Sequence, residues 1–181
     1  MVGVPIGSDA YVKECAIKVI RDRGAEKLAR MLPRMSDRHV AFLIISSSLT
    51  ERSVYIERGI DSELTKDACE RLDNMVMWIL EAEMGLTDDT EDEEEFFREG
   101  CQPTNFKLRP YQQAQARLST GAGRLGLPPA VMRRFSASLG NLVSTLPAVI
   151  AGLSGPVGEA VKEKMPECVL VARMGDAIKE L

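Results

Sequence analysis

The chain has 181 residues, of which 45% are hydrophobic and 28% charged, and its formal net charge is −4. These values are typical of a soluble globular protein with a real core. No apolar run approaches the roughly 20 residues that span a bilayer, and the start lacks the basic and apolar regions of a secretory signal. We therefore expect an intracellular protein that does not enter a membrane; nucleus and cytoplasm both remain open.

The composition favours helices, because Leu, Ala, Met, Glu and Arg are abundant and aromatic residues make up only 5% of the chain. Residues 1–7 (MVGVPIG) are broken by Gly and Pro, which predicts a short extended segment and a turn. Ser8 is a good N-cap for a helix whose apolar stripe continues to Leu32 and which ends at Pro33. We predict an all-α fold, an irregular multi-helix bundle with a short extended N-terminal segment.

Two further helical stretches come next in the chain. The first begins after Ser36 and runs through apolar residues to a break near Leu49, beyond which a short helix is expected. The second carries the cleanest helical period of the chain, from Ser62 to Gly85. Because Trp78 lies off the centre of its main apolar stripe, we expect this helix to be covered on two sides.

Residues 87–99 (TDDTEDEEEFFRE) carry eight acidic residues against one basic, a local charge of −7 that leaves +3 for the rest of the chain. Thr90 and Glu93 match a capping box, so part of this segment forms either a short helix to Arg98 or a solvated loop. It is the only candidate boundary. We divide the chain into an N-terminal helical bundle (1–86), this acidic segment (87–99), and a basic helical region (100–181) that packs on the bundle.

The basic region contains no Asp or Glu between residues 100 and 158. That stretch has a local charge of +6, supplied by Lys107, Arg109, Arg117, Arg124, Arg133 and Arg134. Helical composition returns at 109–118, Pro128-Pro129 restarts a helix, and Pro147 divides the stretch after it into short pieces. Charge segregation of this kind concerns partners rather than fold. Each arginine can contact phosphate, face solvent, or pair with the acidic segment.

Residues 121–126 (GAGRLG) match the spelling of the dinucleotide-binding motif G-x-G-x-x-G. That motif needs a buried strand before it, a helix N-terminus after it, and an acidic residue about 20 positions on. Here a polar, helical segment precedes the glycines, and the next acidic residue is Glu159. We therefore predict a turn in which glycine supplies positive φ and Leu118, Leu125 and Leu127 insert into the core.

No catalytic or metal-ligating constellation stands out in the sequence. The four cysteines, at positions 15, 69, 101 and 168, form no C-x-x-C pair, and the one histidine, His39, lies at a predicted helix start. Zinc sites need closer spacing. We expect buried reduced thiols, a surface or capping histidine, no metal and no other cofactor, and we predict that the chain is not an enzyme on its own.

Four phrases stand in the order that they have in reverse transcriptases of non-LTR retroelements. Residues 3–12 (GVPIGSDAYV) resemble the stretch that closes the palm at the primer grip, and residues 28–60 are similar to the helical thumb-like pattern. Residues 72–86 (LDNMVMWILEAEMGL) resemble the family's next helix, and residues 116–147 resemble the block after the polymerase core. The family's catalytic Y/F-x-D-D turn, which binds two Mg²⁺, is missing, because Asp88-Asp89 lies in the acidic segment without a strand before it.

The resemblance implies the palm end and thumb of a polymerase without its catalytic palm. A thumb holds the template–primer duplex, and Lys and Arg do this by neutralising phosphates rather than by reading bases. We assign phosphate contact to the six cations named above, with Arg124 best placed because N–H groups of nearby glycines can join it. By resemblance alone, Gly3, Gly7 and Ser8 are assigned to a primer-grip-like turn. An RNA or DNA duplex is the expected partner.

A second function explains the same sequence. The chain can be a helical protein-interaction module derived from a retroelement, without nucleic-acid binding, and this requires an exposed apolar groove. The acidic segment could also mask the basic region by imitating nucleic acid. Salt dependence separates the two functions, because only phosphate contacts predict an affinity that falls steeply with salt.

Overall fold

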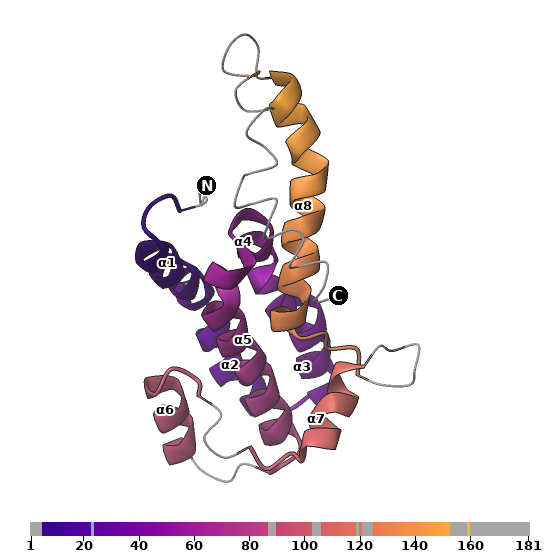
Figure 1. Cartoon of the computed structure of the whole chain (residues 1–181). Helices are drawn as coiled ribbons and strands as arrows, with labels where there is room; N and C mark the ends of the chain where they lie inside the picture. The colour runs from indigo at the N-terminus through magenta and orange to yellow at the C-terminus, as the bar shows by residue number, and fades with distance from the viewer. Residues whose placement is uncertain are drawn as a thin grey trace.

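The computed structural model describes residues 5–22, 24–86, 90–102, 106–118, 120, 125–152 and 159. These residues contain helices and no strand, so the predicted all-α fold is confirmed. In chain order the elements are α1 (Asp9–Asp22), α2 (Ala25–Met31), the 3₁₀ turn η1 (Leu32–Arg34), α3 (Arg38–Ile44), the π turn η2 (Ile45–Leu49), the 3₁₀ turn η3 (Thr50–Ser53), α4 (Val54–Gly59), α5 (Ser62–Glu83), α6 (Thr90–Arg98), α7 (Pro110–Arg117) and α8 (Ala130–Gly152) (Figure 1). Within this part of the chain, none of the helices combines the length and the apolar character of a membrane span.

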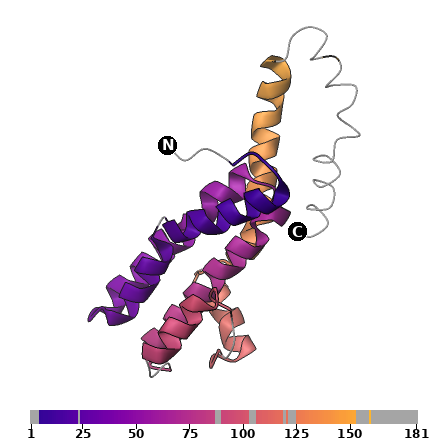
Figure 2. The ribbon, with the colours of Figure 1, turned by 90° about the vertical axis from the view of Figure 1, so that its left-hand side faces the viewer.

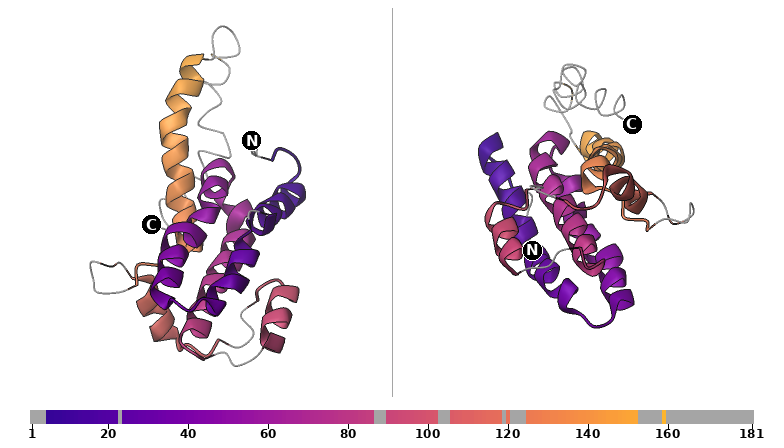
Figure 3. Two further views of the ribbon diagram at one scale, coloured as in Figure 1. Left: turned by 180° about the vertical axis from the view of Figure 1, so that it is seen from behind. Right: turned by 90° about the horizontal axis from the view of Figure 1, so that it is seen from below.

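Helix α5 is the centre of the bundle, with α1 and α2 packed against one side and α4 and α8 against another (Figures 1 and 3). All seven residues from Met75 to Glu81 are buried, so this stretch has no solvent-facing side. The prediction that this helix is covered on two sides is confirmed. Gly85 follows its end with a φ of 70°, a left-handed conformation that glycine adopts at little cost.

The N-terminal helix predicted between Ser8 and Pro33 is present but broken once. Gly24 separates α1 from α2 with a φ of 75°. Ser8 lies at the predicted start, where its Oγ accepts a hydrogen bond from the N–H of Tyr11 at 3.4 Å. The next helix, α3, is capped by Asp37, whose carboxylate accepts from two N–H groups of the first turn.

Between α3 and α4 the chain stays helical but passes through two other hydrogen-bonding patterns. The π turn η2 and the 3₁₀ turn η3 stand where a break was predicted near Leu49. Two hydroxyl groups donate to carbonyls one turn earlier, Ser47 to Leu43 at 2.6 Å and Thr50 to Ser46 at 2.8 Å. Such bonds bend helices. After these turns, α4 packs against α8.

Residues 90–98 of the acidic segment form helix α6, so the short helix is present there rather than the solvated loop. Aromatic packing attaches this helix to α5. The rings of Phe96 and Phe97 pack on Trp78 of α5, with centroid distances of 5.7 Å and 5.4 Å. Aromatic pairs at such distances prefer the offset and edge-on arrangements seen here.

Helix α8 differs from the prediction, because it continues through Pro147 to Gly152 instead of dividing into short pieces. A proline removes one backbone hydrogen bond, and the bonded turns on both sides carry the helix across it. The first half of α8 packs on α4 and α5. Its second half extends beyond the bundle, away from the end that carries α6 and α7 (Figure 2).

Candidate nucleic-acid interface

Arg133 of α8 is held inside the protein, with a side chain that is 19% exposed. Its Nε donates to Glu57 Oε2 at 2.9 Å and its Nη2 to Oε1 at 3.0 Å, a bidentate pair with a residue that is 0% exposed. The same Nη2 donates to the carbonyl of Thr50 at 2.5 Å and to Ser53 Oγ at 3.0 Å. We call these four residues the Arg133 clamp. The clamp joins α8 to η3 and α4.

The clamp keeps the guanidinium charged and occupied. Burial alone would lower the pKa of Arg133, but the hydrogen bonds and the charge of Glu57 raise it above its ordinary value. The hydroxyl of Ser53 donates to the same carboxylate, so Glu57 is satisfied from two sides. The guanidinium of Arg133 therefore makes its hydrogen bonds within the chain.

Arg134 is also buried, with 4% of its surface exposed. Its Nε donates to the carbonyl of Ser62 at 2.9 Å, and its guanidinium lies over the ring of Phe135, 4.0 Å from the centroid. A longer contact, 3.5 Å, joins it to Glu63. The alternative that each arginine pairs with the acidic segment is wrong for Arg133 and Arg134, whose carboxylate partners lie in η3, α4 and α5.

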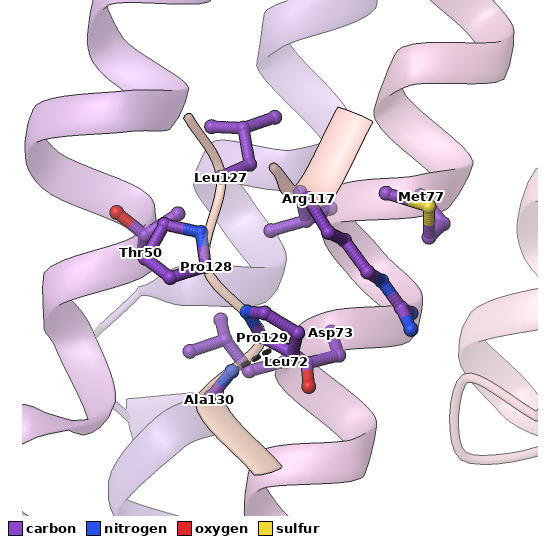
Figure 4. A pocket seen from close by; sticks show the side chains of 10 residues that line it. Thr50, Leu72, Asp73, Met77, Arg117, Leu127, Pro128, Pro129 and Ala130 are labelled. Atoms are coloured by element: carbon purple, nitrogen blue, oxygen red, sulfur yellow. Dashed lines mark hydrogen bonds between the residues drawn. The ribbon is translucent and has the colours of Figure 1, made fainter. Parts of the chain in front are cut away.

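Arg117 ends α7 beside the carboxylate that fixes the start of α8. Asp73 of α5 accepts from the N–H of Ala130 at 2.7 Å and of Val131 at 3.1 Å, so a neighbouring helix supplies the N-cap (Figure 4). Burial raises the pKa of Asp73 above its ordinary value, although the two N–H bonds and the charge of Arg117 oppose the rise. The half-buried Arg117 and Asp73 line a cavity of about 10 Å³, room for one water.

Lys107 and Arg109 are exposed on a turn whose backbone is fixed. Between them, Leu108 is buried, and its N–H donates to the buried carboxylate of Glu81 at 2.8 Å. Arg109 precedes α7, and its N–H donates to Gln112 Oε1 at 2.9 Å. The two charged side chains thus project from a rigid support. We call the cations of this region the α7 edge: Lys107, Arg109 and Arg117.

The glycine-rich turn is described only in part, since residues 121–124 lie outside the described ranges. Gly126 has a φ of 70°, which confirms the predicted positive φ. Leu127 is buried and Leu125 packs against the core as predicted, whereas Leu118 is 49% exposed and its prediction was wrong. The carbonyl of Leu118 accepts from Gly126 at 2.9 Å, so the chain reverses there and the side chain stays outside. No strand precedes this turn within the described residues.

Of the remaining predicted site residues, two lie outside the described residues and two precede α1. Arg124 and Gly3 lie outside the described residues. Gly7 and Ser8 are exposed and immediately precede α1. A Cβ on Gly7 would lie 2.8 Å from Cδ1 of Tyr11, so a larger residue there would require this exposed ring to move. The primer-grip assignment of this turn stays a prediction.

The acidic segment pairs with the N-terminal bundle. Glu93 of α6 is buried, and its two oxygens accept from Arg30 at 3.3 Å and from Arg34 at 3.0 Å. Arg30 also lies over the ring of Phe97, 4.2 Å from its centroid. The interpretation of this segment as a mask over the basic region is wrong for Glu93, whose partners belong to α2 and η1.

The thiols are structural in the described part of the chain. Cys69 and Cys101 are buried and free, and burial raises the pKa of each to about 12. Cys15 is half-buried and free, while Cys168 lies outside the described residues. His39 is exposed at the start of α3. Among the described residues, no group of three or more His, Cys, Asp or Glu side chains could hold a metal.

No protein-family model, curated protein or solved structure matches the chain. The geometry of the chain itself is therefore the basis for assigning a function. Two residues that organise this geometry, Glu57 and Asp73, were not identified from the sequence. Asp73 lies four residues after Cys69 and three before Val76, so helical spacing alone places it on the apolar stripe. An acidic residue on an apolar stripe is the signal that could have revealed it.

Proposed function

We propose that this chain is a non-catalytic, thumb-like helical module of the retroelement reverse-transcriptase type that holds template–primer nucleic acid through backbone phosphates. The observation that carries the proposal is the α7 edge, where two exposed cations stand on a fixed turn before α7 and a third, half-buried, ends that helix. The surrounding sequence, residues 100–158, contains no carboxylate side chain that would repel phosphate. Phosphate contacts position a nucleic acid without reading its sequence, so spaced cations on a rigid support suffice.

The size of the expected effect follows from counterion release. Three phosphate contacts predict that the logarithm of the association constant falls with the logarithm of salt with a slope of about −2.7. Raising salt from about 50 to about 200 mM, a roughly fourfold change, then weakens binding about fortyfold. The Arg133 clamp adds nothing to this slope, because its guanidinium is already paired.

The test is fluorescence anisotropy with a labelled RNA–DNA duplex, titrated with the full chain at several salt concentrations. The variant Lys107→Glu/Arg109→Glu removes the two exposed cations and should reduce the slope by about 1.8, or about 0.9 per lost contact. The matched control, Lys13→Glu/Lys18→Glu, makes the same charge change at two exposed positions of α1. Arg117 is left intact because its charge acts on Asp73. Equal binding by the two variants, or binding independent of salt, would refute the proposal.

A protein-interaction module is the second candidate, favoured by apolar side chains on α3. Val40 is 38% exposed and Leu43 50%, and residues three apart share one face of a helix. If the duplex does not bind, a salt-insensitive partner that is lost in Leu43→Ser and retained in the α7-edge variant would support this function.

A further inference from the structure

One aromatic side chain stands among the cations of the α7 edge and takes no part in their phosphate contacts. Tyr111 lies in the first turn of α7, two residues after Arg109 and four after Lys107, and it is 56% exposed. Within the described residues its ring packs on no other ring and lies under no guanidinium. Helix α7 itself lies at the outer edge of the bundle (Figure 1). The ring is therefore available to a ligand.

The backbone that carries Tyr111 is fixed before any ligand binds. Pro110, at the start of the helix, restricts φ there. On the preceding turn, the carbonyl of Leu108 accepts from Gln113 Nε2 at 2.9 Å, and the N–H of Leu108 donates to the buried carboxylate of Glu81 at 2.8 Å. A tyrosine side chain has only two χ angles, so ordering its ring costs little entropy. The ring and the cations thus share one rigid support.

The exposed face of α7 continues from this ring without a charge. Gln115 and Leu118 are also exposed, and residues four and seven positions after Tyr111 lie on the same side of a helix. The stretch around them, residues 100–158, contains no Asp or Glu. A polyanion can therefore approach the ring and the cations together without meeting a carboxylate side chain of this stretch. This charge complementarity favours a nucleic acid over a protein, whose binding would not need the cations.

We infer that the α7 edge binds a nucleic-acid strand at an unpaired nucleotide, whose base stacks on the ring of Tyr111. Such stacking tolerates any base, because each has a π-face. Lys107 and Arg109 contact phosphates of the same strand, so this inference rests on the proposed function and identifies the part of the nucleic acid that is held there.

An unpaired nucleotide fits this ring better than a paired one. Inside a duplex both faces of a base are covered by its neighbours, and taking the base out of the stack costs a few kcal/mol. An unpaired base offers its face without that cost. A free single strand and the unpaired extension of a duplex present the same chemistry to Tyr111.

The test is fluorescence anisotropy of the full chain with a labelled strand of about eight thymidines, measured at several salt concentrations. Tyr111→Ala should weaken binding about 5- to 150-fold, the loss expected for one stacked base. This factor should be the same at every salt concentration, because stacking releases no counterions. Tyr111→Phe keeps the ring and should bind like the wild type. Lys107→Glu/Arg109→Glu should instead reduce the salt slope by about 1.4, or about 0.7 per phosphate contact of a single strand.

A matched control and a direct signal assign the contact. Tyr11→Ala is the control, since Tyr11 of α1 is 52% exposed and lies outside the α7 edge. In the chain with isotopically labelled tyrosines, saturation with the strand should move the ring signals of Tyr111 to lower frequency, because the ring current of a stacked base shields them. No binding of the strand, equal loss in Tyr111→Ala and Tyr11→Ala, or unmoved ring signals of Tyr111 would overturn the inference.

A blunt duplex and the same duplex with an unpaired extension separate the two sources of the strand. An extension that raises the affinity in the wild type but not in Tyr111→Ala identifies a duplex extension as the ligand, and an extension without effect identifies a free single strand. Tyr111→Ala should leave the affinity and the salt slope of the blunt duplex unchanged.

Failure of this inference is distinguishable from failure of the proposed function. If Lys107→Glu/Arg109→Glu reduces the salt slope of the duplex but Tyr111→Ala binds the thymidine strand like the wild type, only this inference fails. If strand binding depends on Tyr111 but the duplex binds Lys107→Glu/Arg109→Glu and the Lys13→Glu/Lys18→Glu control equally, the proposed hold on a duplex fails.

Discussion

Arg133→Met tests the central electrostatic feature of the fold. Methionine keeps much of the side-chain length and removes the charge. Glu57, which is 0% exposed, then loses both charge-assisted bonds while it stays buried. Removing one partner of a buried ion pair costs about 3–5 kcal/mol, because the other charge is left uncompensated. In a protein of this size each kcal/mol shifts Tm by about 2–4 °C, so Tm should fall by about 6–20 °C.

The assay is urea unfolding followed by far-UV circular dichroism and by the fluorescence of Trp78, the only tryptophan. Arg133→Lys should be intermediate, because an ammonium keeps the charge but lacks the planar fork. Arg98→Met is the control, since that side chain is 75% exposed and pairs with Glu95 only at 3.9 Å. Such surface pairs contribute about 0–1 kcal/mol.

The double variant Glu57→Leu/Arg133→Met separates charge from packing. Without either charge, no ion is buried alone, and stability should return close to that of the wild type. If Arg133→Met costs no more than the Arg98→Met control, or if the double variant is as unstable as the single one, Arg133 does not neutralise a buried carboxylate and the clamp is misassigned.

Three further predictions concern α8, α6 and the thiols. Burial raises the pKa of Asp73, so the carboxyl group binds its proton more tightly in the folded protein than in the unfolded chain. As pH rises from the ordinary carboxyl pKa through the raised one, the free energy of unfolding of the wild type should therefore fall relative to that of Asp73→Asn. Urea unfolding at several pH values between about 4 and 7 measures this, and a constant difference would contradict it. Phe97→Ala should cost about 3–5 kcal/mol and shift the emission of Trp78 to longer wavelength; unchanged emission would mean that α6 does not dock there. Cys69 and Cys101, with pKa values of about 12, should resist alkylation at neutral pH in the folded protein and react in denaturant, as read by peptide mass. Rapid native labelling of either would contradict their burial.

Local sequence rules predicted the elements whose ends depend on adjacent residues. Ser8 and Pro33 bracket the first helical stretch, and Gly126 adopts the positive φ expected of the turn. The same rules failed at Pro147, where helical turns on both sides continue. They also could not predict that the break near Leu49 would be a π turn followed by a 3₁₀ turn, because that geometry depends on how η3 faces α8.

The candidate site was less predictable than the fold, because periodicity tells which face of a helix is buried but not which helix covers it. The sequence shows a basic region, but whether each of its cations is exposed or paired depends on residues far away in the chain. Arg133 meets Glu57 across 76 positions, and Asp73 meets Ala130 across 57. These partners occupy Arg133 and Arg134, so phosphate contact stays a prediction for the α7 edge and for Arg124, which lies outside the described residues.

The contacts that attach α8 are separate from those that support the α7 edge. Asp73 and Arg133 hold the first turns of α8, and Asn141 binds the carbonyl of Arg58 in α4 two turns later. The α7 edge depends on other contacts, chiefly the bond from Leu108 to Glu81, and Figure 1 places α7 at the end of the bundle opposite to α4. Arg133→Met, assayed below its Tm, should therefore leave the salt slope of duplex binding unchanged. A smaller slope in this variant would mean that the bundle transmits the disturbance of α8 to α7.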